Sequence, residues 1–344
     1  MVVGTVVVKG GGGAGLGDRL RAVISGVAVA KLTGRQLFVD WTDGRNAPEG
    51  VNAFTELLDV PGLDLADKLP ESDSVDPASW RGHLPLSMDA LYRQDGCPPW
   101  SHQAAVERYS TDLSKIDRPE EVLVLFDFLQ FAKLRPALHA RFGIPLDWPD
   151  TRAQTPLFRE HLAPRQEVRA AIDEFATARF TAHPVIGVHV RLTREAVAQK
   201  GLVPLARYFA AIDCILAANR EGMIFLATDN AEISQAFAER YPRCVSREKW
   251  FGAPGEPLHL NPSCPDPLQQ SRDALVDMLL LARCDYLLHA GTSSFSLLAA
   301  VAAGLPAGRE IIVGREPPAG LRRILAFAER AAKQLQRRLL ARST

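Results

Sequence analysis

The stretch Asp277–Ala303, DMLLLARCDYLLHAGTSSFSLLAAVAA, contains a predicted helix, a short apolar strand from Asp285, a hydroxyl-rich turn and a second helix from about Ser294. A strand–turn–helix unit directs backbone N–H groups and the positive end of a helix at one point, which suits a phosphate. The turn Gly291–Ser296 adds four hydroxyls and an aromatic ring, as a nucleotide diphosphate with a flat base would require. An ordinary helix N-cap is the alternative, because Ser and Thr are favoured there.

Two other segments place ligand-binding side chains at the ends of predicted strands. Val185–Thr193, VIGVHVRLT, is an apolar strand, and because side chains alternate along a strand, His189 and Arg191 leave it on the same face. Arginine offers a planar fork of donors that matches a diphosphate and stays charged. Met223–Asn230, MIFLATDN, is a second buried strand with the carboxylate of Asp229 at its end. Ligands of doubly wound sheets bind at the carboxyl ends of the strands, so we expect these groups on one edge.

Taken together, these motifs resemble a known family. The order GxHVRxT, ATDN and D-x7-D-x6-TSSFS, preceded by an N-terminal GxGLGxRLRA loop, resembles the fucosyltransferase superfamily. That group includes the rhizobial nodulation α-1,6-fucosyltransferases, the N-glycan core fucosyltransferases and the protein O-fucosyltransferases. The resemblance covers the N-terminal loop and about residues 185–304. It implies an α/β chain of two Rossmann-like domains facing across a cleft, the GT-B type of glycosyltransferase.

The resemblance also implies a site. Arg191 would contact the β-phosphate and the departing oxygen of GDP-fucose, with His189, Asp277 and the Ser293–Phe295 turn as further nucleotide contacts. GDP-fucose or another nucleotide-sugar is a donor substrate, so no cofactor is expected, and the acceptor would be a glycan, a lipid-linked molecule or a small molecule. The chain departs from the family pattern at three positions, which leave donor and acceptor open: Leu192, Asn230 and Asp18.

Residues at the strand ends and in the N-terminal loop complete the predicted site. The predicted donor-binding set is His189, Asp229, Asp277, Thr292, Ser293, Ser294, Phe295, Gly15, Gly17 and Arg19. Arg191 is the predicted catalytic residue, and Glu195, four residues beyond it, is a candidate general base. The other candidates for that base are Asp18, Asp40 and Asp43.

The predicted reaction is an inverting glycosyl transfer without a metal ion. The sequence has no D-x-D triplet and no histidines at i,i+4 spacing, so no metal site is predicted. Arg191 and the amides of residues 291–296 would stabilise the departing diphosphate. Two structural alternatives stay open: Arg191 could form an ion pair with Asp229 or Asp277, and Asp277 could lie on a solvated helix face. A catalytically silent relative, or one that uses a different donor, is also open.

The N-terminus carries a competing motif. Thr5–Val8, a glycine-rich loop, a helix from about Asp18 to Leu32 and Leu37–Trp41 form a predicted βαβ start. Gly10-x-Gly12-x-x-Gly15 and a carboxylate ending the second strand match a dinucleotide fingerprint, so an NAD-dependent oxidoreductase is the alternative function. A helix that starts only after Gly17 disfavours it, because the last fingerprint glycine should open the helix. Further glycines in a first turn would each cost about 1 kcal/mol relative to alanine.

Composition excludes several classes of partner. Lys+Arg and Asp+Glu both total 40, so there is no basic field and no nucleic-acid partner is expected. Five cysteines without a C-x-x-C pair predict free thiols in a reducing compartment. The N-terminus lacks the basic region of a signal peptide, and no run approaches the ~20 apolar residues of a spanning helix. These features predict a cytoplasmic protein.

Length and proline content predict the domain organisation. The chain has 344 residues, more than one typical domain of ~100–200 residues. We predict an N-terminal acceptor-side domain at residues 1–150, with irregular loops over 43–119, and a nucleotide-sugar-binding domain at 160–318. The proline-rich run Ile144–Pro156 is the predicted linker. Residues 319–344 form a predicted basic helix that packs back on the first domain, with a weak membrane-surface contact as the alternative.

Overall fold

The structure is a computed structural model that describes residues 4–11, 13–97, 102–191, 203–253, 258 and 261–314. The chain forms two compact units. Unit 1 comprises Met1–Ala171 and Leu258–Val276, and unit 2 comprises Ile172–Pro257 and Asp277–Thr344. These units are defined by their internal contacts, whereas the domain bounds drawn from the sequence remain a prediction.

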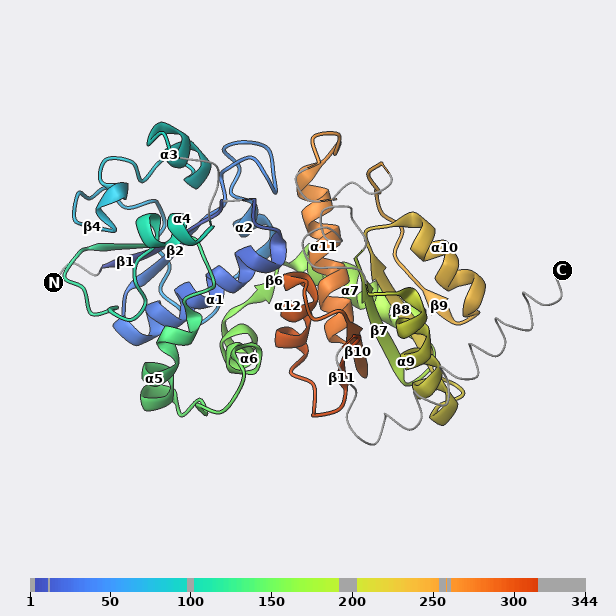
Figure 1. Ribbon diagram of the computed structural model, residues 1–344. Coiled ribbons are helices and arrows are strands. Elements are labelled where there is room, and N and C mark those ends of the chain that lie inside the picture. Colours follow the sequence, from blue (N-terminus) through green and yellow to red (C-terminus); the bar gives the residue numbers. More distant parts are fainter. Residues whose placement is uncertain are drawn as a thin grey trace. The chain divides into compact units, whose positions relative to one another are not determined.

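The described part of unit 2 contains a sheet of five parallel strands in the order β11-β10-β7-β8-β9 (Figure 1). Their bounds are β7 Val185–Val190, β8 Met223–Thr228, β9 Cys244–Val245, β10 Tyr286–His289 and β11 Glu310–Ile312. The chain starts at the centre with β7, builds outward to β9 and returns to the other side of β7 with β10. The sheet is therefore doubly wound, and ligands of such sheets bind at the switch point, here between β7 and β10.

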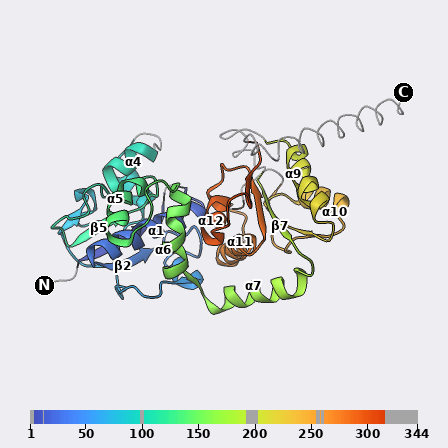
Figure 2. The same cartoon turned by 90° about the horizontal axis from the view of Figure 1, so that it is seen from below.

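Helices cover both faces of this sheet (Figures 1 and 2). Their bounds are α7 Gln166–Arg179, α9 Leu205–Ala218, α10 Ala231–Arg240, α11 Pro267–Ala282 and α12 Ser294–Ala303. Ile186 and Val188 belong to a core with α9 and α10 on one face. On the other face, the ring of Phe225 lies 5.6 Å from that of Phe175 in α7, and a Cβ on Gly187 would lie 3.2 Å from Leu281 in α11. Burial on both faces explains the continuous apolar runs of β7 and β8, which confirm the predicted strands.

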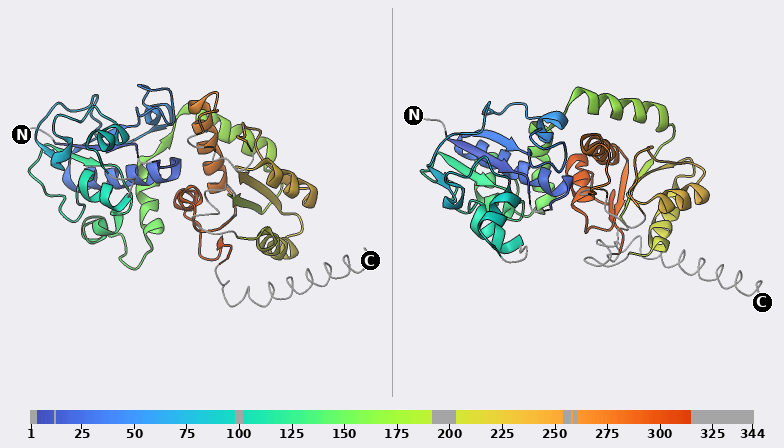
Figure 3. Two further views of the ribbon diagram at one scale, coloured as in Figure 1. Left: turned by 45° about the horizontal axis from the view of Figure 1, so that its top comes forward. Right: turned by 90° about the horizontal axis from the view of Figure 1, so that it is seen from above.

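The described part of unit 1 contains a sheet of four parallel strands in the order β2-β1-β5-β4. Their bounds are β1 Thr5–Lys9, β2 Gln36–Asp40, β4 Val75–Asp76 and β5 Val122–Leu125. The helix α1, Leu16–Thr33, runs along this sheet (Figure 3). Gly26 allows the close approach, because a Cβ there would lie 2.4 Å from Val8 Cγ2. A separate antiparallel pair joins β3, Leu58–Asp59, to β6, Ala163–Pro164.

Short helices occupy the segment 43–119, for which the sequence predicts irregular loops. They are α2 Ala53–Leu57, the 3₁₀ helix η1 Ala78–Trp80, α3 Met88–Gln94 and α4 His102–Tyr109. The prediction is wrong for these stretches. Buried Trp80, Met88 and Tyr109 pack with Val7 and Val124 of the sheet in one core, and such packing stabilises helices too short to form alone.

The predicted linker Ile144–Pro156 is also wrong in part. The helix α5 spans Phe131–Phe142, and α6, Asp150–His161, begins inside the predicted linker and lies in unit 1. Pro156 removes one backbone donor from α6. The helix persists because Leu157 and Phe158 are buried, and burial of one helix face outweighs a single missing hydrogen bond.

The start of α1 differs from the prediction as well. Gly15 is its N-cap and Leu16 its first residue, so Gly17 lies in the first turn and the helix opens directly after the last fingerprint glycine. The predicted late start of this helix is therefore wrong and does not count against a dinucleotide fold. Almost every residue from Leu16 to Ala30 is buried, and packing of this extent overrides the weak helix propensity of glycine.

No helix within the described ranges is long and apolar enough to cross a membrane. The predicted C-terminal helix at residues 319–344 lies outside the described residues. Its predicted packing, and the alternative of a membrane-surface contact, remain predictions.

Candidate functional site

The carboxyl edge of the unit 2 sheet carries an arginine in contact with a carboxylate. Arg191 directly follows β7 and Asp229 directly follows β8, the neighbouring strand. Arg191 Nε lies 3.5 Å from Asp229 Oδ2, and the two side chains are 25% and 14% exposed. One of the ion pairs left open by the sequence is therefore present. It holds a partly exposed guanidinium at the edge where doubly wound sheets bind ligands.

His189 connects the end of β7 to the first turn of α12. Its ring stacks on that of Phe295, with centroids 4.9 Å apart and planes 27° from parallel. Burial lowers the pKa of His189 well below its ordinary value, and the nearby His289, Arg191 and Lys249 lower this pKa further. His189 is therefore neutral near pH 7, and the stacked pair offers a flat surface without charge beside Arg191.

The start of α12 has hydrogen-bonding groups suited to an anion. Ser293 is the N-cap, yet its side chain makes no capping hydrogen bond. The Ser293 hydroxyl is buried and has no hydrogen-bond partner among the described residues. The N–H groups of a first helical turn also lack partners within the helix, and the helix dipole favours negative charge there. Thr292, exposed, and Ser294, half-buried, flank this N-cap.

Asp277 lies in α11 between two cations. It is 2% exposed, with Oδ2 2.5 Å from Lys249 Nζ and Oδ1 3.4 Å from Arg247 Nη1. The alternative of a solvated helix face is therefore wrong. Arg247 and Lys249 follow the end of β9 and were not among the predicted site residues. Their sign in the sequence is two basic residues at alternating positions, which the structure places just beyond β9.

The structure brings the unit 2 members of the predicted site together at one edge. Arg191 contacts Asp229, and the ring of His189 stacks on that of Phe295. Lys249 pairs with Asp277 and also lowers the pKa of His189. The residues at the start of α12 follow β10, which pairs with β7. Glu195 lies outside the described residues, and Gly15, Gly17 and Arg19 belong to unit 1. The ligand roles of all these residues remain predictions.

The sequence suggests that Arg19 lies in a loop facing a ligand, but the structure places it in a helix. It lies in the first turn of α1, 2% exposed, and its fork binds Asp43 with Nη1 to Oδ1 at 3.1 Å and Nη2 to Oδ2 at 2.5 Å. Its Nε donates to the Ala14 carbonyl. A Cβ on Gly10 would lie 2.2 Å from Arg19 Nη1, so Gly10 leaves room for this arginine. The sequence gives no sign of this, because the partner follows in the chain only after the second strand.

The same packing disfavours a dinucleotide at the N-terminal motif. In that fold, the carboxylate ending the second strand binds a ribose hydroxyl. Here Asp40 Oδ2 lies 2.5 Å from the buried Lys9 Nζ, and Oδ1 accepts from the Thr42 hydroxyl at 2.6 Å. Burial lowers the pKa of Lys9, while Asp40 opposes that shift. Both oxygens of Asp40 are thus in use, and Arg19 fills the space beside Gly10.

The described residues contain no cluster of three or more His, Cys, Asp or Glu that could hold a metal ion. The ion pairs at the carboxyl edge of unit 2 instead join Arg191 to Asp229, and Arg247 and Lys249 to Asp277. Arginine and lysine side chains at this edge suit an anionic ligand.

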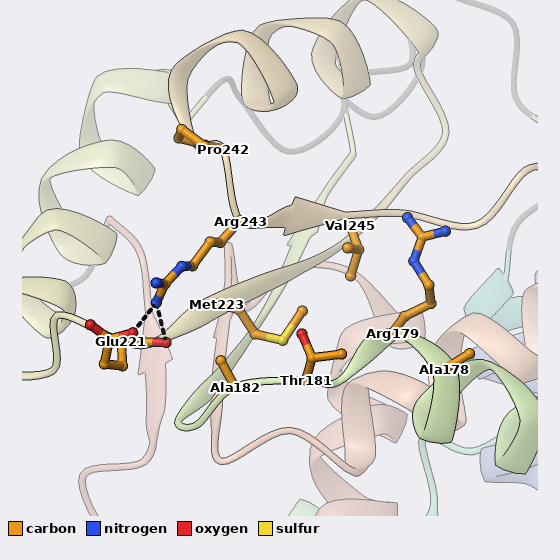
Figure 4. A pocket seen from close by; sticks show the side chains of 9 residues that line it. All are labelled: Ala178, Arg179, Thr181, Ala182, Glu221, Met223, Pro242, Arg243 and Val245. Atoms are coloured by element: carbon orange, nitrogen blue, oxygen red, sulfur yellow. Dashed lines mark hydrogen bonds and ion pairs between the residues drawn. The ribbon is translucent and has the colours of Figure 1, made fainter.

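A hollow of about 410 Å³ opens near the amino edge of the same sheet (Figure 4). It is lined by Met223 at the start of β8, Arg179 at the end of α7, and Arg243, which pairs with Glu221 at 2.7 Å. None of the predicted site residues lines it. Because ligands of doubly wound sheets bind at the opposite edge, this hollow is not the candidate site.

Comparisons with known proteins agree with this geometry. A family model for nodulation protein Z (NodZ) matches residues 145–334. The chain is 29% identical over 307 residues to nodulation protein Z of Azorhizobium caulinodans, covering 82% of this chain and 84% of the relative. Its fold is similar to a crystal structure of the fucosyltransferase NodZ from Bradyrhizobium, with TM-score 0.57, 22% identity and coverage of 87% and 92%. A crystal structure of NodZ alpha-1,6-fucosyltransferase soaked with GDP-fucose gives TM-score 0.51, 22% identity and the same coverage, 87% and 92%.

These solved structures have the GT-B type of α/β fold, and the two parallel sheets of this chain have that fold as well. The family model matches more than half of the sequence, residues 145–334 of 344. The chain belongs to the nodulation protein Z (NodZ) family.

Proposed function

We propose that this chain is a fucosyltransferase that moves L-fucose from GDP-fucose to an acceptor hydroxyl, with inversion and without a metal ion. Membership of the NodZ family and the named fucosyltransferases among the similar proteins support this activity. One observation carries the proposal. On either side of the switch point stand the Arg191 guanidinium, after β7, and the buried Ser293 hydroxyl, after β10, which has no partner within the described residues.

The donor would bind through its phosphates at this point. A diphosphate oxygen would accept hydrogen bonds from Arg191, from Ser293 and from the first-turn amides of α12, while the contact between Arg191 and Asp229 persists. Asp229 would then orient the guanidinium. The neutral, stacked His189–Phe295 pair would contact the nucleoside without adding charge. Asp277 would act with its two cations, and Thr292 and Ser294 would add hydroxyl contacts beside the N-cap.

The proposed catalytic roles follow from where negative charge develops during the transfer of fucose. An acceptor oxygen attacks the anomeric carbon as the bond from that carbon to the β-phosphate oxygen breaks, so negative charge grows on the departing GDP. Donors that are already fixed in place stabilise such charge without reorganisation. Arg191 and the amides of α12 are such donors, and we assign them this role.

A general base for the acceptor is the next requirement. Asp40 and Asp43 are held in buried ion pairs with Lys9 and Arg19, so their oxygens are already in use. Asp18 lies half-buried in the first turn of α1, and no ion pair involves it within the described residues. Asp18 therefore remains the candidate among these three. Glu195 remains a candidate outside the described residues.

The acceptor and the cellular location belong to the proposal too. We propose a glycan, lipid-linked or small-molecule acceptor hydroxyl, and a donor-binding domain within residues 160–318. A cytoplasmic location is supported by five cysteines, none of which forms a disulfide.

Donor binding is testable on the full chain by thermal unfolding. At 100 times its Kd, GDP is expected to raise the free energy of unfolding by about 2.7 kcal/mol. GDP and GDP-fucose are expected to raise Tm, while UDP, dTDP and NAD at equal concentration leave it unchanged. A shift with NAD and none with GDP would instead support the dinucleotide alternative. A shift with GDP-fucose but no sugar transfer or hydrolysis would identify a catalytically silent relative.

Chelation tests the assignment of charge stabilisation to arginine. Turnover of GDP-fucose is expected to be unchanged, within about twofold, in excess EDTA, because fixed donors rather than a metal ion would stabilise the leaving diphosphate. The measurement is GDP release after prior dialysis against EDTA. Loss of turnover in EDTA and its recovery on adding Mg²⁺ or Mn²⁺ would contradict the proposal.

A further inference from the structure

The strand β11 lies beside β10, which precedes the turn before α12 (Figure 1). A chain of two hydrogen bonds connects β11 to that turn. His289, the last residue of β10, is completely buried. The Gly291 N–H donates to His289 Nδ1 at 3.1 Å, and His289 Nε2 lies 3.0 Å from Glu310 Oε1. A backbone N–H can only donate, so Nδ1 must accept. A neutral imidazole then carries its proton on Nε2 and donates it to the carboxylate of Glu310.

The turn that this hydrogen bond holds is tightly constrained. Gly291 has φ +73°, in the left-handed region, and a Cβ there would lie 2.6 Å from Ile312 Cγ2. Only glycine fits this approach to β11. Two residues later Ser293 forms the N-cap of α12, with its buried hydroxyl lacking a partner among the described residues. The conformation at Gly291 therefore sets where that hydroxyl and the first amides of α12 point.

We propose that Glu310 is a positioning residue for the donor site. By accepting the Nε2 proton, Glu310 selects the His289 tautomer whose Nδ1 accepts the Gly291 N–H, and so fixes the turn that receives the diphosphate. The inference rests on the proposed function of that turn. Glu310 itself belongs to an exposed position of β11 and acts through His289, two hydrogen bonds away from Gly291.

Three substitutions of Glu310 separate tautomer selection from simple charge. Glu310→Gln keeps an oxygen that accepts from Nε2, so donor affinity is expected within about twofold of the parent. Glu310→Met keeps the length but has no such acceptor, and the KM for GDP-fucose is expected to rise on the order of fivefold to tenfold, the scale of one lost hydrogen bond. Glu310→Lys donates to Nε2, which forces the opposing tautomer, and is expected to raise KM more than Met does. kcat is expected to change less than KM in all three.

A role of Glu310 through its charge alone predicts the opposite change in KM. If Glu310 mattered only as a negative charge near an anionic ligand, all three substitutions would lower KM, and Lys would lower it most. Glu239→Met, which removes an exposed carboxylate from α10, is the matched control and is expected to leave KM unchanged. Equal KM values for Glu310→Gln and Glu310→Met would overturn the inference.

The tautomer provides a readout without turnover. In protein with ¹⁵N-labelled histidine, the His289 resonances of the parent are expected to show a protonated Nε2 and an unprotonated Nδ1, and Glu310→Lys is expected to invert them. Titration with GDP, followed by Tm, completes the test. If GDP fails to shift Tm of the parent, the proposed function fails. If GDP shifts the parent and Glu310→Met equally, the positioning role fails alone.

Discussion

Replacing Arg191 with lysine is expected to leave the fold intact and to reduce turnover on the order of 10²-fold, the scale observed when one oxyanion donor is removed. Lysine keeps the charge but loses the planar fork, which would bind more tightly as negative charge accumulates on the departing GDP. The loss should therefore appear in kcat more than in donor affinity. Arg191→Ala is expected to lose more, because it removes the charge as well. Steady-state transfer from GDP-fucose and GDP binding by calorimetry measure the two quantities.

A purely structural role of the ion pair between Arg191 and Asp229 is the competing explanation for a loss of turnover. If Arg191 served only to pair with Asp229 across β7 and β8, Asp229→Asn would reduce turnover as much as Arg191→Lys, and Arg191→Ala would unfold. The matched control is Arg243→Lys, an exposed arginine paired with Glu221 near the amino edge of the same sheet. That variant is expected to retain parental turnover. Near-normal turnover in Arg191→Ala would refute the catalytic assignment.

The strands and helices of unit 2 were predictable because their physical environment leaves a simple pattern. β7 and β8 are buried on both faces, so they are apolar or small except at His189 and Thr228 near their carboxyl ends, and Arg191 and Asp229 follow the strands directly. The hydroxyl-rich turn and the start of α12 at Ser294 also follow from local sequence, because caps and turns are set by neighbouring residues. The site residues at this edge of the sheet are thus the ones that the neighbouring sequence is enough to predict.

Long-range pairing could not be predicted in the same way. Arg247 and Lys249 follow a strand of two residues and look like a solvated loop, yet both meet Asp277, 30 and 28 residues away. Helix starts were missed for a related reason. The burial of α1 allows Gly17 in its first turn, although the propensity of glycine alone favours a later start. In each case a tertiary contact outweighs what the neighbouring residues prefer.

The buried pair of Arg19 and Asp43 gives the largest expected effect on stability. The two side chains are 1% and 4% exposed, and Asp43 is the carboxylate that both guanidinium nitrogens bind. Asp43→Ala would leave the Arg19 charge buried without its partner. We expect it to lower the free energy of unfolding by about 3–5 kcal/mol, the cost of breaking a buried ion pair on one side. Urea denaturation measures the loss. Glu221→Ala, which breaks the exposed pair with Arg243, is the control and should cost about 1 kcal/mol or less.

Replacing both partners separates the structural role of Arg19 from its predicted contact with the donor. Apolar residues of similar volume often replace a buried ion pair without loss of stability, so Arg19→Met with Asp43→Leu is expected to recover most of what Asp43→Ala loses. Turnover should recover with stability, because the fork of Arg19 is already bound by Asp43 and its Nε by the Ala14 carbonyl. A double variant as stable as the parent but deficient in turnover would contradict this expectation. Arg19 would then contact the substrate as the N-terminal motif predicts, and Asp43 would serve to hold it ready.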